Sequence, residues 1–306
     1  MKLNGKNMLH PVIAVTFCLA LSVGFVASLY ILVPSNVRNL GRNDHRQVKA
    51  RMVAVVVFCF IATLSFRVFC QVLNYEAWWT LMGLVNWKTS RDVKVLWHSM
   101  QLFLGPLTVG GIQLFYAWAH DEFSFLPHGL SLLDFRDYIA APTFEELVFR
   151  GCMTWPLLSV AQWSMLRVTF VAPLFFGCAH AHHAFLKLQQ YPHQKLVILL
   201  STLFQFTYTT MFGWYSTYAF IHTGSLLSVI ASHSFCNLMG LPDLSFMTYK
   251  HTTRSMDHHD CDQVLHRLRY VLIAVYVLGI VLFARGFQNE RIFDNQGGLL
   301  TILSQN

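Results

Sequence analysis

Long apolar runs separated by short polar loops make up most of the chain. A helix needs about 20 consecutive apolar residues to cross the hydrocarbon core of a bilayer. Eight segments, give or take one, have this character. They cover residues 12–32, 52–73, 95–119, 138–160, 166–186, 196–220, 225–241 and 270–287. The pattern predicts an all-α polytopic membrane protein, a bundle of about eight transmembrane helices, with residues 1–306 forming a single integral membrane domain.

Two other tracts interrupt this pattern. Residues 77–85 are short and rich in Trp, which is typical of a segment at the membrane interface. Residues 256–262 read Met-Asp-His-His-Asp-Cys-Asp and look like a metal site. They lie in a polar stretch, however, and no helical i, i+4 pair of ligands supports them. We therefore expect a solvated loop there.

Basic residues concentrate in the loops 33–51 and 242–269. Each of these loops joins an odd-numbered apolar run to the next even-numbered one, so both lie on the same side of the membrane. Short loops rich in Lys and Arg favour the cytoplasmic side. The sequence thus predicts both loops in the cytoplasm and both termini on the opposite side.

The composition agrees with a membrane protein and excludes several other classes. Hydrophobic residues make up 55% of the chain and charged residues 12%, about half the roughly 25% of soluble domains. The seven cysteines form no zinc pattern or secreted disulfide framework. The net charge of +7 is spread between the apolar runs, so it indicates membrane topology and no nucleic-acid partner. Because charge is so scarce, ionisable groups inside the runs are candidates for function.

Two adjacent carboxylates occupy the fourth apolar run, in the sequence Glu145-Glu146-x-x-x-Arg150. Glu146 and Arg150 are four residues apart, so they share a helix face and can form an ion pair. Glu145 lies about 100° around the helix and is free to face another group. The alternative is that both carboxylates only serve the helix dipole and an ion pair near the interface.

Three histidines end the fifth run, where Phe176-x-x-x-His180 is followed by His182 and His183. A single His in an apolar helix is usually a hydrogen-bonded core residue, but three in four positions also suit a metal site. No His-Glu-x-x-His sequence occurs in the chain, so the usual helix of zinc peptidases is absent.

The seventh run contains His233-x-x-x-Asn237. The two side chains are four residues apart and lie on one side of a helix. Both can donate hydrogen bonds in a dry cavity, an arrangement that suits a developing oxyanion. Taken alone, the pair is better explained as polar contacts between neighbouring helices.

Together, these three clusters supply the groups for peptide hydrolysis inside a polar intramembrane cavity. A carboxylate and a His can activate water, while a second His and an Asn can stabilise an oxyanion. The clusters lie within residues 138–245, which we predict to be the catalytic core.

At these positions the chain resembles the CPBP family of intramembrane proteases, which is related to the abortive-infection proteins. That family carries Glu-Glu-x-x-x-Arg, Phe-x-x-x-His and His-x-x-x-Asn motifs in this order. The sequence around the motifs resembles that of the eukaryotic branch of the family, the Ras-converting type II CAAX prenyl endopeptidases.

The resemblance implies removal of the C-terminal aaX tripeptide from farnesylated or geranylgeranylated CAAX proteins, such as Ras-type small GTPases. It implies that Glu145 and His180 activate water and that His233 and Asn237 hold the oxyanion. The supporting residues are then Glu146, Arg150, Phe176 and His183. The resemblance further implies a metal-free enzyme without a cofactor, in the endoplasmic reticulum membrane, with its active site accessible from the cytosol.

Three other functions stay open from the sequence. A non-proteolytic membrane scaffold of the same family would tolerate loss of all the site residues. A transporter would use the carboxylates and histidines as a proton relay, although no internal repeat supports it. A zinc-dependent membrane peptidase would bind its metal through His180, His183 and His233.

Overall fold

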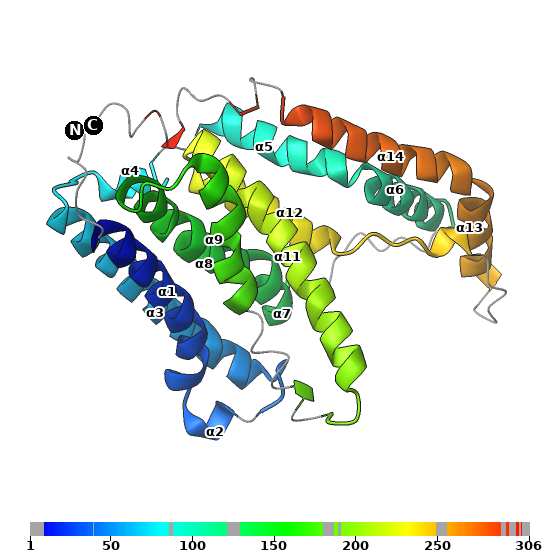
Figure 1. The fold of residues 1–306 in the computed structure, drawn as a ribbon. Coiled ribbons are helices and arrows are strands. Elements are labelled where there is room, and N and C mark those ends of the chain that lie inside the picture. Colours follow the sequence, from blue (N-terminus) through cyan, green and yellow to red (C-terminus); the bar gives the residue numbers. More distant parts are fainter. Residues whose placement is uncertain are drawn as a thin grey trace.

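The structure is a computed structural model that describes residues 9–38, 40–85, 88–120, 129–179, 187–188, 191–248, 256–288, 292–293, 298–299 and 301. Within these ranges the chain is helical and has no strand (Figure 1). Its α-helices are α1 (Leu9–Ile31), α2 (Ser35–Arg38), α3 (His45–Val72), α4 (Trp78–Leu81), α5 (Thr89–Leu102), α6 (Leu104–Ala119), α7 (Leu132–Phe135), α8 (Ala141–Glu146), α9 (Met165–Ala179), α11 (Lys195–Thr223), α12 (Leu226–Met239), α13 (Met256–Arg267) and α14 (Arg269–Gly286). Three π-helical segments, η1 (Arg136–Ala140), η2 (Leu147–Cys152) and η3 (Pro156–Val160), and the 3₁₀ turn η4 (Ser245–Met247) complete the set.

The prediction of an all-α polytopic membrane protein is confirmed. Each of the eight apolar runs falls on helical structure where the structure describes it. Four helices in the described part are long and apolar enough to cross a membrane alone, namely α1, α3, α11 and α14. The bent pair α5 and α6 gives up to five such spans, while α9 and α12 are apolar but shorter.

The third apolar run is a broken helix instead of a straight span. The axes of α5 and α6 differ by 79°, and the break falls at Phe103. Pro106 lies in the first turn of α6, where its missing N–H removes a hydrogen bond to α5 and its ring restricts the preceding residue. The proline therefore explains why an apolar stretch of sufficient length does not continue in one direction.

The prediction of a solvated loop at residues 256–262 is wrong. These residues begin α13, which spans Met256–Arg267. Its inward side carries Cys261 and Leu265, both of which are buried with Leu272 of α14 in a small apolar cluster. The apolar residues of this stretch follow the spacing of one helix turn, a signal that the many polar residues around them obscure.

The helices form two groups around a central segment. Figure 1 shows α1 beside α3 at one side and α5, α6 and α14 at the other, with α8, α9, α11 and α12 between them. The central segment is η2, which contacts α1, α3, α9, α11 and α12. Five of its six residues are buried. Arg150 and the rest of the segment that follows the two glutamates are thus enclosed by the bundle.

A buried histidine joins α5 to α11 and α14. His98 is 0% exposed, and its Nε2 lies 2.8 Å from the carbonyl oxygen of Phe283. Its Nδ1 lies 3.3 Å from the hydroxyl of Tyr215, which also bonds Ser99 at 2.9 Å. These contacts satisfy polar groups at the centre of an apolar interface, so His98 has a structural role here.

The close approach of α14 to the α5–α6 break gives a test of this packing. A Cβ added at Gly279 would lie 2.6 Å from the carbonyl oxygen of Gln101. We expect Gly279→Ala to lower the midpoint of thermal unfolding in detergent, since overpacking costs about 1–3 kcal/mol. Gly110→Ala on α6 is the matched control, because no heavy atom of the described residues lies within 4 Å of its added Cβ. Equal midpoints for the two variants would contradict the packing described for α14.

Candidate active site

The carboxylate of Glu146 is at the centre of a buried polar network. Its side chain is 0% exposed. Its Oε1 accepts hydrogen bonds from Arg150 Nη1 at 3.1 Å and from His233 Nδ1 at 2.8 Å. Its Oε2 accepts from the hydroxyl of Ser216 at 2.7 Å. The ion pair predicted from the i, i+4 spacing is confirmed, and the network brings η2, α11 and α12 together at one carboxylate.

The helix changes its hydrogen-bonding pattern immediately after Glu146. Residues Ala141–Glu146 are α-helical, while Leu147–Cys152 form the π-helical segment η2. Such segments occur frequently at functional sites because the wider turn shifts side chains out of the regular helical register. Apolar periodicity predicts a helix through this region but carries no signal for the change of winding.

Hydrogen bonding fixes the orientation of His233. An ionised carboxylate only accepts hydrogen bonds, so Nδ1 of His233 carries the proton in its bond to Glu146. Nε2 then points the other way and lies 3.8 Å from Oε2 of Glu145. The side chain of Glu145 is 18% exposed, in contrast to its fully buried neighbour. One water molecule can contact both the Glu145 carboxylate and Nε2 of His233.

Aromatic rings enclose the imidazole and the arginine. Phe176 of α9 lies over the Arg150 guanidinium at 5.3 Å and meets the ring of His233 edge-on at 6.5 Å. Phe212 of α11 packs on the His233 ring at 4.6 Å. Because these rings displace water, the ion pair and the imidazole lie in a medium where their electrostatic interactions are stronger.

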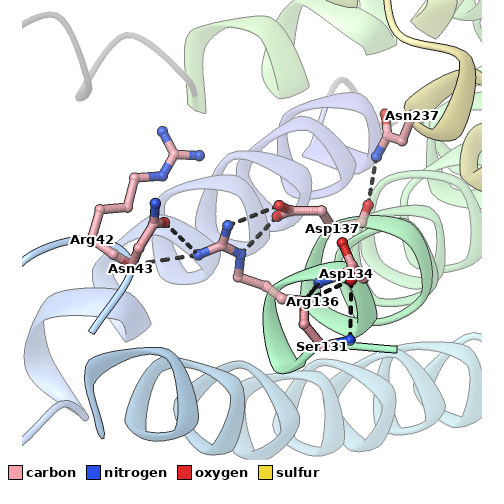
Figure 2. A network of polar contacts seen from close by, with 7 residues as sticks. All are labelled: Arg42, Asn43, Ser131, Asp134, Arg136, Asp137 and Asn237. Atoms are coloured by element: carbon pink, nitrogen blue, oxygen red, sulfur yellow. Dashed lines mark hydrogen bonds and ion pairs between the residues drawn. The ribbon is translucent and has the colours of Figure 1, made fainter. Parts of the chain in front are cut away.

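Asn237 lies one helical turn beyond His233 on α12, at the exposed edge of the site. Its Nδ2 donates a hydrogen bond to the carbonyl oxygen of Asp137 at 2.9 Å (Figure 2). An amide nitrogen carries two hydrogens, so a second donor remains. Gly240 ends α12 shortly afterwards with a φ of 61° and a ψ of −152°. Glycine adopts this conformation without strain because it has no Cβ. The oxyanion role of Asn237 stays a prediction.

The segment before the two glutamates is fixed at its start by a capping box. The hydroxyl and the backbone N–H of Ser131 both donate to the Asp134 carboxylate (Figure 2). The side-chain hydrogen bond, followed by the backbone one, lowers the pKa of Asp134 below its ordinary value. These contacts define where α7 begins, and α7 continues without a break into η1 and α8.

Two of the predicted site residues, His180 and His183, lie outside the residues that the structure describes. The pairing of His180 with Glu145 therefore stays a prediction. Among the described residues no three His, Cys, Asp or Glu side chains are grouped as a metal site. Of the three histidines considered as zinc ligands, only His233 falls in the described part.

Ser216 and Phe212 are site residues that sequence reasoning missed. A serine in an apolar helix usually donates to a carbonyl of its own helix, so its presence on α11 carries no signal. Phe212 is one of 26 phenylalanines in the chain. Only the packing of α11 against η2 and α12 distinguishes them from their neighbours.

Comparison with known proteins identifies relatives of this chain. A family model described as type II CAAX prenyl endopeptidase Rce1-like matches residues 127–239, a range that includes every site residue named above. A probable CAAX prenyl protease 2 from Schizosaccharomyces pombe is 36% identical over 227 residues, which are 72% of this chain and 78% of the relative. The chain belongs to the type II CAAX prenyl endopeptidase family. The limits of the 138–245 core stay a prediction.

The similarity to members of this family extends well beyond the matched region. CAAX prenyl protease 2 from Homo sapiens is 31% identical over 291 residues, which are 89% of this chain and 79% of the relative. The protein of the same name from Saccharomyces cerevisiae is 27% identical over 290 residues, 86% of this chain and 91% of the relative. No solved structure gives a significant match to the chain. The N-terminal spans are thus part of what this chain shares with its relatives.

The hydrogen bond from Ser216 to Glu146 leads to a stability prediction. Ser216→Ala leaves one oxygen of a buried carboxylate without its donor, which costs about 1–3 kcal/mol. We expect a lower midpoint of thermal unfolding in detergent. Ser201→Ala on the same helix is the matched control, because its hydroxyl donates only to the carbonyl of Ile198 within α11. If both variants unfold at the same temperature, the Ser216 bond does not stabilise the site.

Proposed function

We propose that this protein removes the aaX tripeptide from farnesylated or geranylgeranylated CAAX proteins, including Ras-type small GTPases. The observation that carries the proposal is the convergence of Glu145 and His233. A partly exposed carboxylate lies 3.8 Å from an imidazole nitrogen whose ring is held by a buried carboxylate. In a membrane protein of the type II CAAX prenyl endopeptidase family, this pair supports hydrolysis of a peptide bond next to a lipid-modified cysteine.

In the proposed mechanism, Glu145 acts with His180 to take a proton from water. The water oxygen attacks the carbonyl carbon of the prenylated cysteine, and the carbonyl oxygen becomes an oxyanion. Collapse of the tetrahedral intermediate breaks the C–N bond, and Glu145 returns its proton to the leaving amine. The products are a tripeptide and a prenylcysteine carboxylate, so a single carboxylate serves as base and then as acid.

The hydrogen bond between Glu146 and His233 constrains the proposed oxyanion role. Nδ1 of His233 already donates to Glu146, so His233 can donate to an oxyanion only if Nε2 is protonated as well. A carboxylate that accepts from one nitrogen stabilises the imidazolium form, as in Ser-His-Asp triads. We assign this function to Glu146, while the second amide hydrogen of Asn237 provides the other donor.

The physical nature of the substrate suits a membrane site. A farnesyl or geranylgeranyl chain partitions into hydrocarbon, whereas the rest of a CAAX protein is soluble. We propose that the protein resides in the endoplasmic reticulum membrane and that its site is open to the cytosol, on the side of the basic loops 33–51 and 242–269. The bilayer then holds the lipid group while the peptide reaches Glu145 from the water.

Substitution of the proposed catalytic residues tests the mechanism. We expect Glu145→Gln, His180→Ala and His233→Ala each to lower the rate of aaX release from a farnesylated reporter by about 100-fold or more, the contribution of general acid–base groups. Release is measured by mass spectrometry with purified protein. Glu76→Gln and His45→Ala, at exposed positions, are the controls. Near-normal turnover by all three site variants would refute these catalytic roles, whereas no release of aaX by the wild-type protein would favour the scaffold alternative.

Metal analysis separates this mechanism from that of a zinc peptidase. Glu145 and His233 supply a base and a hydrogen-bond donor, so we expect cleavage of a prenylated CAAX peptide to continue with a chelator present. Active protein should contain far less than one zinc per chain. The unprenylated peptide should be a much poorer substrate. Activity that requires stoichiometric zinc would establish the metal-dependent alternative instead.

A further inference from the structure

Three arginines from separate parts of the chain gather beside the site. Arg42 lies in the loop before α3, Arg51 lies in α3 and Arg136 begins η1. Nη1 of Arg136 donates to the carbonyl oxygen of Arg42 at 3.4 Å and to Oδ1 of Asn43 at 3.3 Å (Figure 2). Arg51 interacts electrostatically with both Arg42 and Arg136. The sequence separates these residues by up to 94 positions along the chain.

The positive charges of this cluster are only partly compensated. Arg136 forms two hydrogen bonds with the Asp137 carboxylate, at 2.7 and 2.8 Å. The guanidinium of Arg42 extends away from these groups, and Figure 2 draws no contact from it. Arg51 is half-buried, and its Nε is a buried donor without a hydrogen-bond partner among the described residues. Like charges repel and a buried donor without a partner is unfavourable, so an anionic ligand would stabilise this arrangement.

The cluster lies close to the proposed catalytic groups. Tyr208 of α11 is within electrostatic range of both Arg42 and Glu145. Asp137, the partner of Arg136, accepts the hydrogen bond of Asn237 through its carbonyl oxygen. Arg136 precedes Glu145 by nine residues of continuous helix, which span roughly 13 Å at the α-helical rise.

This distance is of the same order as the length of the segment that the proposed reaction releases. Three residues in extended conformation cover about 10 Å. If the scissile carbonyl lies at Glu145 and the peptide runs toward η1, the free C-terminal carboxylate arrives at the arginines. Guanidinium groups bind carboxylates through paired hydrogen bonds, which gives both affinity and defined geometry.

We propose that Arg42 and Arg51 bind the C-terminal carboxylate of the substrate and thereby set the length of the released peptide at three residues. Arg136, which is already bonded to Asp137, is a positioning residue that holds the Arg42 loop against η1. This inference rests on the proposed endopeptidase function. A lipid phosphate offers the same anionic oxygens, so the experiment must distinguish these two sources.

The test compares two farnesylated CAAX peptides that differ only at the C-terminus, one a free acid and the other a carboxamide. We expect the wild-type protein to cleave the acid with a kcat/KM about 10-fold higher or more, the value of a hydrogen bond to a charged group. Arg51→Gln and Arg42→Gln should lower kcat/KM for the acid toward that for the carboxamide. Their effect on the carboxamide, which offers one neutral acceptor oxygen, should be much smaller.

Arg46→Gln is the matched control, because Arg46 belongs to the same basic region but is exposed and paired with Asp44. It removes the same charge and should preserve the preference for the acid. Since Arg51 is half-buried, the exposed Arg42 gives a second variant that does not depend on core packing.

Three results would overturn the inference. Equal kcat/KM for acid and carboxamide with the wild-type protein would refute it and leave the proposed function intact. A wild-type rate that rises equally on both peptides with vesicles of anionic phospholipid, and no longer does so in the arginine variants, would assign the cluster to lipid phosphate. Cleavage of neither peptide by the wild-type protein would refute the proposed function and this inference with it.

Discussion

A buried negative charge on Glu146 is the constraint on which the rest of the site depends. Its three hydrogen-bond donors come from η2, α11 and α12. The carboxylate is therefore compensated only when these helices pack together. A buried ion pair is not in itself a strong source of stability, but removing one partner costs about 3–5 kcal/mol because the other charge stays uncompensated. The network therefore favours one relative placement of the helices over any alternative that leaves the carboxylate exposed to hydrocarbon.

The same constraint gives two adjacent glutamates different environments. Glu146 has all its hydrogen-bonding capacity directed into the protein, while Glu145, about 100° around the helix, is 18% exposed. His233 links them, because one ring nitrogen is bound to Glu146 and the other faces Glu145. Chemistry that needs an accessible base beside an oriented imidazole can thus be performed by Glu145 without disturbing the charge that holds the bundle together.

The sequence predicted those features that depend on spacing within one helix. Apolar runs located each of the four or five candidate membrane spans among the described helices, although eight spans were predicted, and the i, i+4 rule predicted the Glu146–Arg150 pair. Prediction from the sequence failed for features that depend on contacts between segments or on the local winding of a helix. No single apolar run predicts the hydrogen bond from Ser216 or the π-helical winding after Glu146. Nor does one predict that Arg42, Arg51 and Arg136 lie close together. Pro106 is the signal in the sequence for the bend at Phe103, and a prediction from the length of the apolar run does not take it into account.

The arrangement of charge explains how such a site could select both ends of its proposed substrate. Lipid-facing helices such as α11 expose many large apolar side chains, including Leu203 and Phe204, which suit a prenyl chain. The basic cluster of Arg42, Arg51 and Arg136 suits a carboxylate. Because one end is held by apolar contact and the other by charge, the two preferences do not compete for the same surface. Under this proposal, a peptide that satisfies both preferences places its third residue from the C-terminus next to Glu145, so the position of the cut follows from the distance between Glu145 and the arginines.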